Sequence, residues 1–124
     1  MTLGLPWPPS VNTYWRAFAQ NTRKGLRVRK IISEKGRKYR EQTEAVGALH
    51  VRIAADKRLA VVLDAFPPDR RKRDLDNVPK AVLDALTHAG IYTDDSQIDD
   101  LRIRRRPVVK GGRIEVTISE IRPA

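Results

Sequence analysis

Cysteine is absent from this sequence. Its absence excludes disulfide bonds, zinc sites built from thiolates and cysteine nucleophiles, and it suits a reducing cytoplasm. Long apolar runs are missing too: no stretch reaches the about 20 apolar residues of a membrane span, and the N-terminus lacks the basic-then-apolar order of a signal peptide. We therefore expect no membrane-spanning segment and a cytoplasmic location.

Acidic residues are scarce. The chain has 25 Lys and Arg against 15 Asp and Glu, which gives a formal charge of +10 and a pI near 10.5. Such an excess on a small chain favours a polyphosphate partner, above all nucleic acid. Two other interpretations stay open: a basic protein kept soluble by its charge, and a protein attracted to an anionic membrane surface.

The length limits the number of domains that the chain can form. Its 124 residues fit one domain spanning positions 1–124, with room for one core but not for separate binding and catalytic domains. Binding and chemistry must then share one surface.

Four segments have the pattern of strands, at 2–6, 58–66, 98–107 and 113–121. The second is a nearly continuous apolar run, which is typical of a central strand. Gly111-Gly112 between the last two segments predicts that they pair as an antiparallel hairpin.

Two segments have helical spacing. Ser33 can cap a helix from 34 to about 56, and Asp76 can cap a second helix from 77 to 89 that Gly90 ends. The apolar residues that recur in the first helix are Tyr39, Val46, Leu49 and Ile53. The order strand, helix, strand, helix, strand, strand predicts a two-layer α+β domain, with a mixed sheet of about four strands and both helices on one face.

Between 11 and 30 the sequence mixes polar, aromatic and basic residues, among them Arg16, without a clear period. We interpret this segment as a flexible basic arm that can contact phosphates and stack on bases. The alternative is a surface loop whose Tyr14, with Trp7 just before the segment, is buried in the core.

Aspartates are concentrated in one part of the chain. Eight of the 15 acidic residues are aspartates between 69 and 100: Asp69, Asp74, Asp76, Asp84, Asp94, Asp95, Asp99 and Asp100. In an extended segment, residues 74 and 76 point to the same side. The chain after a helix of about 13 residues can fold back and bring Asp94 and Asp95 to the same end. The pattern predicts a carboxylate cluster.

Clustered carboxylates repel one another and take up protons unless a cation joins them. Magnesium prefers oxygen ligands and keeps waters and phosphate oxygens in its shell, whereas zinc is disfavoured in a chain without cysteine. Beside a DNA backbone, such an ion would support phosphodiester cleavage. A simpler interpretation makes Asp76 a helix N-cap and places Asp99 and Asp100 in a solvated turn.

Cations accompany the aspartates. Asp76, Lys80 and Asp84 follow one another at a spacing of four and would form one stripe on the expected helix. There Lys80 can stabilise the reacting phosphate, or it can form a surface ion pair worth at most about 1 kcal/mol. The run Arg70-Arg71-Lys72-Arg73 directly precedes Asp74 and would contact the phosphates that flank a cut.

Several of these residues form a pattern that is similar to one known family. They are Pro68-Asp69-Arg70-Arg71-Lys72-Arg73-Asp74-Leu75-Asp76-Asn77, Lys80, Asp84-Ala85-Leu86, Asp94-Asp95, Leu5-Pro6-Trp7-Pro8-Pro9-Ser10 with Asn12, and Lys110-Gly111-Gly112-Arg113. Together they resemble the signature of the RusA family of Holliday-junction resolvases over nearly the whole chain. Departures are small: Lys72 replaces an arginine, Val11 stands where a polar residue is common, and Pro79 lies inside the helix start.

The resemblance implies a homodimeric, magnesium-dependent endonuclease, often encoded by phages or prophages, that resolves four-way DNA junctions by paired symmetric nicks in recombination and repair. Carried over by position, the family's essential acids and metal ligands fall on Asp74, Asp76 and Asp95, and its catalytic lysine falls on Lys80. The expected DNA contacts are Arg70, Arg71, Lys72, Arg73 and Arg16. Two symmetric nicks need two sites related by a two-fold axis, which an isologous dimer supplies. The first helix and the central strand are candidate dimer surfaces, and no membrane partner is expected.

Two alternatives remain at this point. The same metal chemistry would serve a less selective flap or branch nuclease, or an RNase. A noncatalytic basic DNA-binding protein, whose aspartates cap helices and pair with arginines, would belong to a different class.

Overall fold

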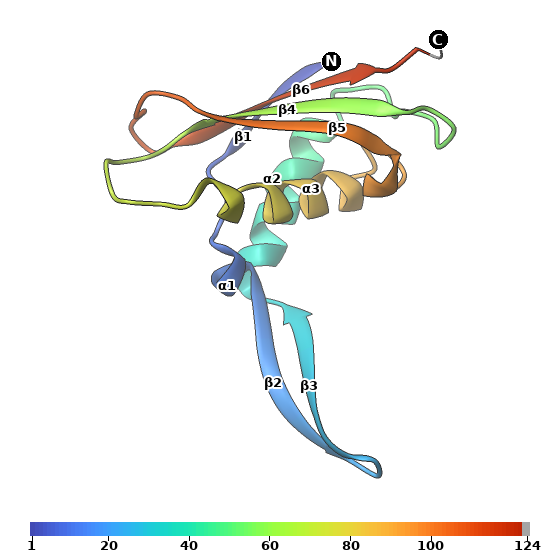
Figure 1. Cartoon of the computed structure of the whole chain (residues 1–124), viewed down its shortest axis with the longest axis vertical. Helices are drawn as coiled ribbons and strands as arrows, with labels where there is room; N and C mark the ends of the chain where they lie inside the picture. Colours follow the sequence, from blue (N-terminus) through green and yellow to red (C-terminus); the bar gives the residue numbers. More distant parts are fainter. Residues whose placement is uncertain (123–124) are drawn as a thin grey trace.

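The computed structural model describes residues 1–122. Along the chain, its elements are β1 (Thr2–Pro6), α1 (Val11–Tyr14), β2 (Trp15–Thr22), β3 (Gly25–Ile32), α2 (Glu34–Gly47), β4 (Leu59–Phe66), the 3-10 turn η1 (Leu75–Asn77), α3 (Pro79–His88), the 3-10 turn η2 (Asp95–Gln97), β5 (Ile98–Arg105) and β6 (Arg113–Glu120). The helices α2 and α3 lie on the same face of the main sheet (Figure 1). The expected two-layer α+β architecture is confirmed.

The main sheet has the strand order β1-β6-β4-β5. Strand β4 lies inside it, antiparallel to β6 and parallel to β5, so the sheet is mixed as expected. Alternate side chains of β4, including Leu59, Val61 and Leu63, are at most 1% exposed and belong to the core that α3 completes with Val82 and Leu86. The apolar run at 58–66 therefore marks the central strand, as its composition predicts.

The expected hairpin between the last two strands is wrong, because β4 lies between β5 and β6. The connection from Arg106 to Gly112 wraps around the end of β4, where Arg106 N donates to Ala65 O at 2.8 Å and Val109 N donates to Pro67 O at 3.0 Å. The two neighbours of one strand lie about 10 Å apart. Seven residues bridge that distance easily, so Gly111-Gly112 are the end of a longer connection and not a two-residue turn.

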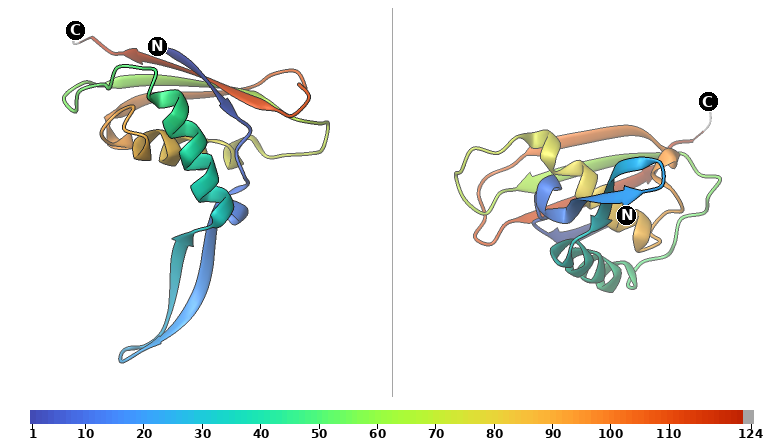
Figure 2. Two further views of the ribbon diagram at one scale, coloured as in Figure 1. Left: turned by 180° about the vertical axis from the view of Figure 1, so that it is seen from behind. Right: turned by 90° about the horizontal axis from the view of Figure 1, so that it is seen from below.

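Residues 15–32 are not an irregular arm. Strands β2 and β3 pair along their whole length in a separate two-stranded sheet. This hairpin extends away from the main sheet (Figures 1 and 2). The alternative interpretation was right about Tyr14, which is fully buried, and Trp7 packs half-buried against the same core.

Helix boundaries differ from the expectation at two places. Ser33 caps α2 by accepting a hydrogen bond from Gly36 N at 3.0 Å, but the helix ends at Gly47, and Leu49 beyond it is 84% exposed. Asp76 does not cap α3, because Val78 occupies the cap position and Asp76 lies in η1. Gly90, with φ +75°, follows the end of α3 as expected. Within residues 1–122, no helix combines the length and apolarity needed to cross a membrane.

Candidate active site

The loop after β4 is held in place by its own charges. The Asp69 carboxylate accepts hydrogen bonds from the Arg73 guanidinium at 2.7 Å and from Arg71 N at 2.9 Å, and these bonds hold the pKa of Asp69 at about 2. Arg105 donates to the carbonyl of Arg73 at 2.8 Å, and the Arg73 guanidinium lies 5.8 Å from the ring centroid of Trp7. The backbone that leads to Asp74 is therefore fixed from both sides.

Asp74 and Asp76 line one shallow hollow, which we call the motif hollow. It is lined by Arg70, Arg71, Lys72, Arg73, Asp74, Leu75, Asp76 and Arg105. Both carboxylates are exposed. Asp74 is extended and begins η1, so the 3-10 turn directs the chain from the basic run into α3. The structure thus brings these two predicted site residues together with the whole basic run.

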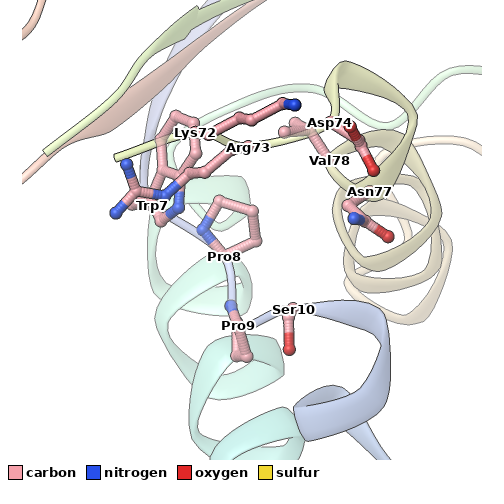
Figure 3. Close-up of a pocket in the computed structure, with 9 residues that line it drawn as sticks. All are labelled: Trp7, Pro8, Pro9, Ser10, Lys72, Arg73, Asp74, Asn77 and Val78. Carbon is pink, nitrogen blue, oxygen red and sulfur yellow. The ribbon is translucent and has the colours of Figure 1, made fainter. Parts of the chain in front are cut away.

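Asp74 also borders a second hollow of about 500 Å³, shown in Figure 3. Trp7 and Arg73 form one side of it, Asp74 and Asn77 form the other, and Pro8 lies between them. The proline-rich segment after β1 therefore reaches the same side of the molecule as the aspartate motif. Sequence reasoning assigned no site role to Trp7, although its position in the proline-rich segment was part of the family resemblance.

Lys80 and Asp95 share a third hollow of about 500 Å³, which we call the lysine hollow. It is lined by Trp15, Pro79, Lys80, Leu83, Asp84, Thr87, Asp94, Asp95 and Leu101. Lys80 is the second residue of α3 and follows η1 closely, so both hollows border the start of that helix. The Lys80 ammonium lies 5.3 Å from the ring centroid of Trp15. Sequence reasoning did not anticipate this contact across 65 positions of the chain.

The carboxyls of Asp94 and Asp95 have opposite pKa shifts. A hydrogen bond from the Ser96 hydroxyl, at 2.8 Å, lowers the pKa of Asp94, which also caps η2 together with Gln97. Desolvation raises the pKa of Asp95, and the adjacent Asp94 and the charge of Asp84 raise it further. Asp95 is thus held where added negative charge is unfavourable and where a cation would be favourable.

Two other aspartates of the cluster are committed to arginines. Asp84 accepts hydrogen bonds from Arg40 Nε at 3.0 Å and from the hydroxyl of Tyr14. Its partners are therefore these two residues and not Lys80, its neighbour in the expected stripe on the helix. Asp99 accepts a hydrogen bond from Arg58 Nε at 3.0 Å at the start of β5, and is not part of a free turn. The arginine contacts therefore account for the negative charges of Asp84 and Asp99 without a bound metal.

The donor set fits a divalent ion in its chemistry. Magnesium is commonly bound through one or two carboxylates, and waters and substrate phosphates complete its shell. The pair Asp74 and Asp76 offers such oxygens, as does Asp95. Within the described part of the chain, no group of three or more Asp, Glu or His side chains is close enough to hold one ion. The convergence of Asp74, Asp76 and Asp95 on one ion therefore stays a prediction.

The expected DNA contacts lie in two places. Arg70, Arg71 and Lys72 are exposed beside the carboxylates, whereas Arg73 is half-buried by its contacts with Asp69 and Trp7. Arg16 is exposed on β2, next to Trp15 of the lysine hollow. Arg105, which completes the motif hollow from β5, was missed because no feature of the sequence links position 105 to position 73.

Comparison with known proteins gives consistent similarity along the chain. Residues 6–119 match the family model described as Endodeoxyribonuclease RusA. The chain is 44% identical over 118 residues to the crossover junction endodeoxyribonuclease rusA of Enterobacteria phage HK97, covering 94% of this chain and 92% of that protein. It is 42% identical to the protein named Crossover junction endodeoxyribonuclease RusA in Shigella sonnei (strain Ss046), with 97% and 94% covered. It is 41% identical to the protein of that name in Escherichia coli (strain K12), again with 97% and 94% covered.

Proposed function

Because this chain belongs to the RusA family of endodeoxyribonucleases, we propose that it resolves four-way DNA junctions by hydrolysing phosphodiester bonds. The observation that carries the proposal is the motif hollow, in which Asp74 and Asp76 lie among the cations of the run from Arg70 to Arg73. A hollow that places carboxylates beside phosphate-binding side chains can hold a DNA backbone where it is to be cut.

Each group of the site has a distinct role in this proposal. Arg70, Arg71 and Lys72 are exposed and bind phosphates on either side of the scissile bond. Lys80 places its ammonium against the phosphoryl oxygens, where negative charge increases in the transition state. Arg73 acts through its contacts with Asp69 and Trp7, which fix the loop that carries Asp74.

Asp74, Asp76 and Asp95 are the proposed magnesium ligands. When bound, the metal would supply an activated water and a counter-charge for the oxygens of the phosphate. The carboxylates themselves provide hard oxygen ligands, and the raised pKa of Asp95 supports a role beside a cation.

We further propose that the active form is a homodimer that acts in the cytoplasm. Resolution of a junction requires two nicks, and two copies related by a two-fold axis present two identical sites to the symmetric substrate. A chain without cysteine suits a reducing compartment.

Asp76→Asn tests the assignment of the site. The variant should lose cleavage of a labelled four-way junction in magnesium, while its affinity for the junction is unchanged or higher, because a negative charge near phosphate is removed. Cleavage is measured on denaturing gels and affinity by electrophoretic mobility shift, with flap, linear duplex and RNA substrates in parallel. Chelation of magnesium should likewise stop cleavage of the wild-type protein.

Asp56→Asn is the matched control, because it makes the same change of charge at an exposed position outside all three hollows. It should cut at the wild-type rate. Normal cleavage by Asp76→Asn would remove Asp76 from the site. Junction binding without products from the wild-type protein would indicate an architectural protein, and equal cutting of flaps and junctions would indicate a less selective nuclease.

A further inference from the structure

The hairpin formed by β2 and β3 is strongly basic. It carries Arg16, Arg23, Lys24, Arg27, Arg29 and Lys30. No acidic residue occurs before Glu34 in the sequence, so no carboxylate within the hairpin neutralises these charges. With a net charge of +10 for the whole chain, the hairpin contributes six of its 25 cations in one narrow projection. An anion is the partner that such a projection attracts.

The strand register divides the hairpin into two different faces. Paired residues of an antiparallel ladder lie on the same face, and successive residues alternate between faces. The pairs Phe18 with Arg29 and Gln20 with Arg27 therefore share a face with Arg16. The Arg29 guanidinium donates to Gln20 Oε1 at 3.1 Å, which is an interaction within this face. We call it the arginine face.

The opposite face has a lower positive charge than the arginine face. It carries Ala17, Ala19, Leu26 and Val28, and Lys30 is its one cation within the described hairpin. Leu26 is 71% exposed and Val28 is 72% exposed. At the base of the hairpin this face continues into Trp15 and Ile32, which pack against the core.

The base of the hairpin is firmly held. Tyr14 is fully buried, and its hydroxyl donates to Asp84 of α3. Ser33 Oγ donates to Tyr14 O at 2.9 Å, and Ser33 N donates to the same carbonyl at 2.9 Å. A hairpin fixed at one end in this way has a defined direction. Its first residue, Trp15, lines the lysine hollow, so the hairpin begins beside Lys80 and Asp95, two of the proposed site residues.

From these observations we propose that the arginine face of the hairpin binds the phosphates of one duplex arm of the branched substrate. Three arginines follow one another along the ribbon in steps of two residues, or about 7 Å. A two-stranded β-ribbon is narrow enough to enter a DNA major groove of about 12 Å width, with arginines reaching the backbones that border it. This inference rests on the proposed action on DNA but names a surface outside the cutting site.

The test measures binding rather than cutting. In an Asp76→Asn background, the triple variant Arg16→Gln, Arg27→Gln and Arg29→Gln is compared with its parent on a four-way junction across a series of salt concentrations. The slope of log affinity against log salt is negative, and each lost phosphate contact makes it shallower by about 0.9. The triple variant should therefore lose about 2.7 from the slope and bind about tenfold or more weakly at low salt.

A charge-matched control separates this site from the effect of net charge alone. Arg52→Gln, Lys57→Gln and Arg122→Gln also remove three cations, from the 48–58 loop and the C-terminal segment, which lie at the far end of the molecule from the hairpin tip (Figure 1). Their salt slope should stay within about 1 of the parent. Equal losses in the two triple variants would overturn the proposal.

A second control examines the other face. Leu26→Thr with Val28→Thr removes apolar surface and no charge, and it should leave affinity and slope unchanged. A loss equal to that of the arginine variant, accompanied by a change of oligomeric state in light scattering, would mean that the hairpin contacts a second protein copy instead of DNA. Because no cleavage is measured, a change of slope stands even if the protein fails to cut junctions.

Discussion

The ammonium of Lys80 lies over an aromatic ring rather than beside a carboxylate. It is 5.3 Å from the ring centroid of Trp15, whose own ring packs against Tyr14 at 4.3 Å between centroids. Cation–π contacts of this kind are worth about 0.5–1 kcal/mol at exposed sites. In the proposed mechanism, Trp15 is therefore a positioning residue, which restricts where the long lysine side chain can place its charge.

Replacing Trp15 with leucine tests this contact at the scale of a single residue. Leucine removes the cation–π contact, which is worth about 0.5–1 kcal/mol. If that energy orients Lys80 in the transition state, the rate constant for junction cleavage should fall about two- to fivefold, with little change in junction affinity. Single-turnover cleavage and binding are measured separately. Trp15→Phe keeps an aromatic ring and should recover most of the rate. A loss of rate in the phenylalanine variant as large as in the leucine variant, or a matching fall in Tm, would assign Trp15 a purely structural role.

At the scale of an element, the joint between α2 and the hairpin depends on a helical glycine. A Cβ atom at Gly36 would lie 2.4 Å from the carbonyl oxygen of Tyr14 and 2.7 Å from Cγ1 of Ile32. Alanine normally stabilises a helix by about 1 kcal/mol relative to glycine. At Gly36 the steric conflict outweighs the higher helix propensity of alanine, because Tyr14 and Ile32, which a Cβ atom would meet, are held in place by the core.

We expect Gly36→Ala to lower the free energy of unfolding by about 1–3 kcal/mol, as overpacking does in a close-packed interior. Urea denaturation followed by circular dichroism measures the change. Gly4→Ala is the control: Gly4 is exposed in β1, and a Cβ atom at this position would meet no atom within 4 Å beyond its chain neighbours, so its effect should stay within about 0.5 kcal/mol. An increase of stability in Gly36→Ala would show that the joint has room to adjust.

Elements were predictable from sequence where burial imposes a pattern. The apolar run at 58–66 and the capped helix starting after Ser33 were found because core packing selects their residues. The hairpin at 15–32 was missed because neither of its faces is buried beyond the base, so the alternation of Leu26, Arg27, Val28 and Arg29 was interpreted as irregular.

Of the candidate site, the sequence predicts the local grouping of residues but not the contacts between distant elements. The run from Arg70 to Asp76 is local, and the fold keeps it together in one hollow. Partners that come from other elements, such as Arg105 for Arg73 and Trp15 for Lys80, depend on sheet order. The sequence patterns misjudged that order, since they paired β5 with β6.

At the scale of the whole molecule, the proposed homodimer leads to a specific prediction about the products of cleavage. If wild-type and Asp76→Asn subunits with different tags are co-expressed, tandem purification should yield mixed dimers with one competent site. On a plasmid with an extruded cruciform, these should give mainly nicked circles, whereas the wild-type dimer should give linear plasmid. Agarose gels distinguish the two products.

Two outcomes would contradict this prediction. Linear product formed by mixed dimers at the wild-type rate would mean that one site makes both cuts. Failure of the two tags to co-purify, together with a monomeric mass in light scattering, would mean that the two nicks do not depend on a stable dimer.

The pleat of the hairpin also limits how its length can change. Only Trp15 and Ile32 at its base pack against the core, so residues can be gained or lost beyond them without disturbing the folded body. Adding one residue to each strand would invert the orientation of everything farther out, whereas adding two would preserve it. The reach of this projection can therefore vary among relatives only in increments of about 7 Å if its cations are to keep facing the same way.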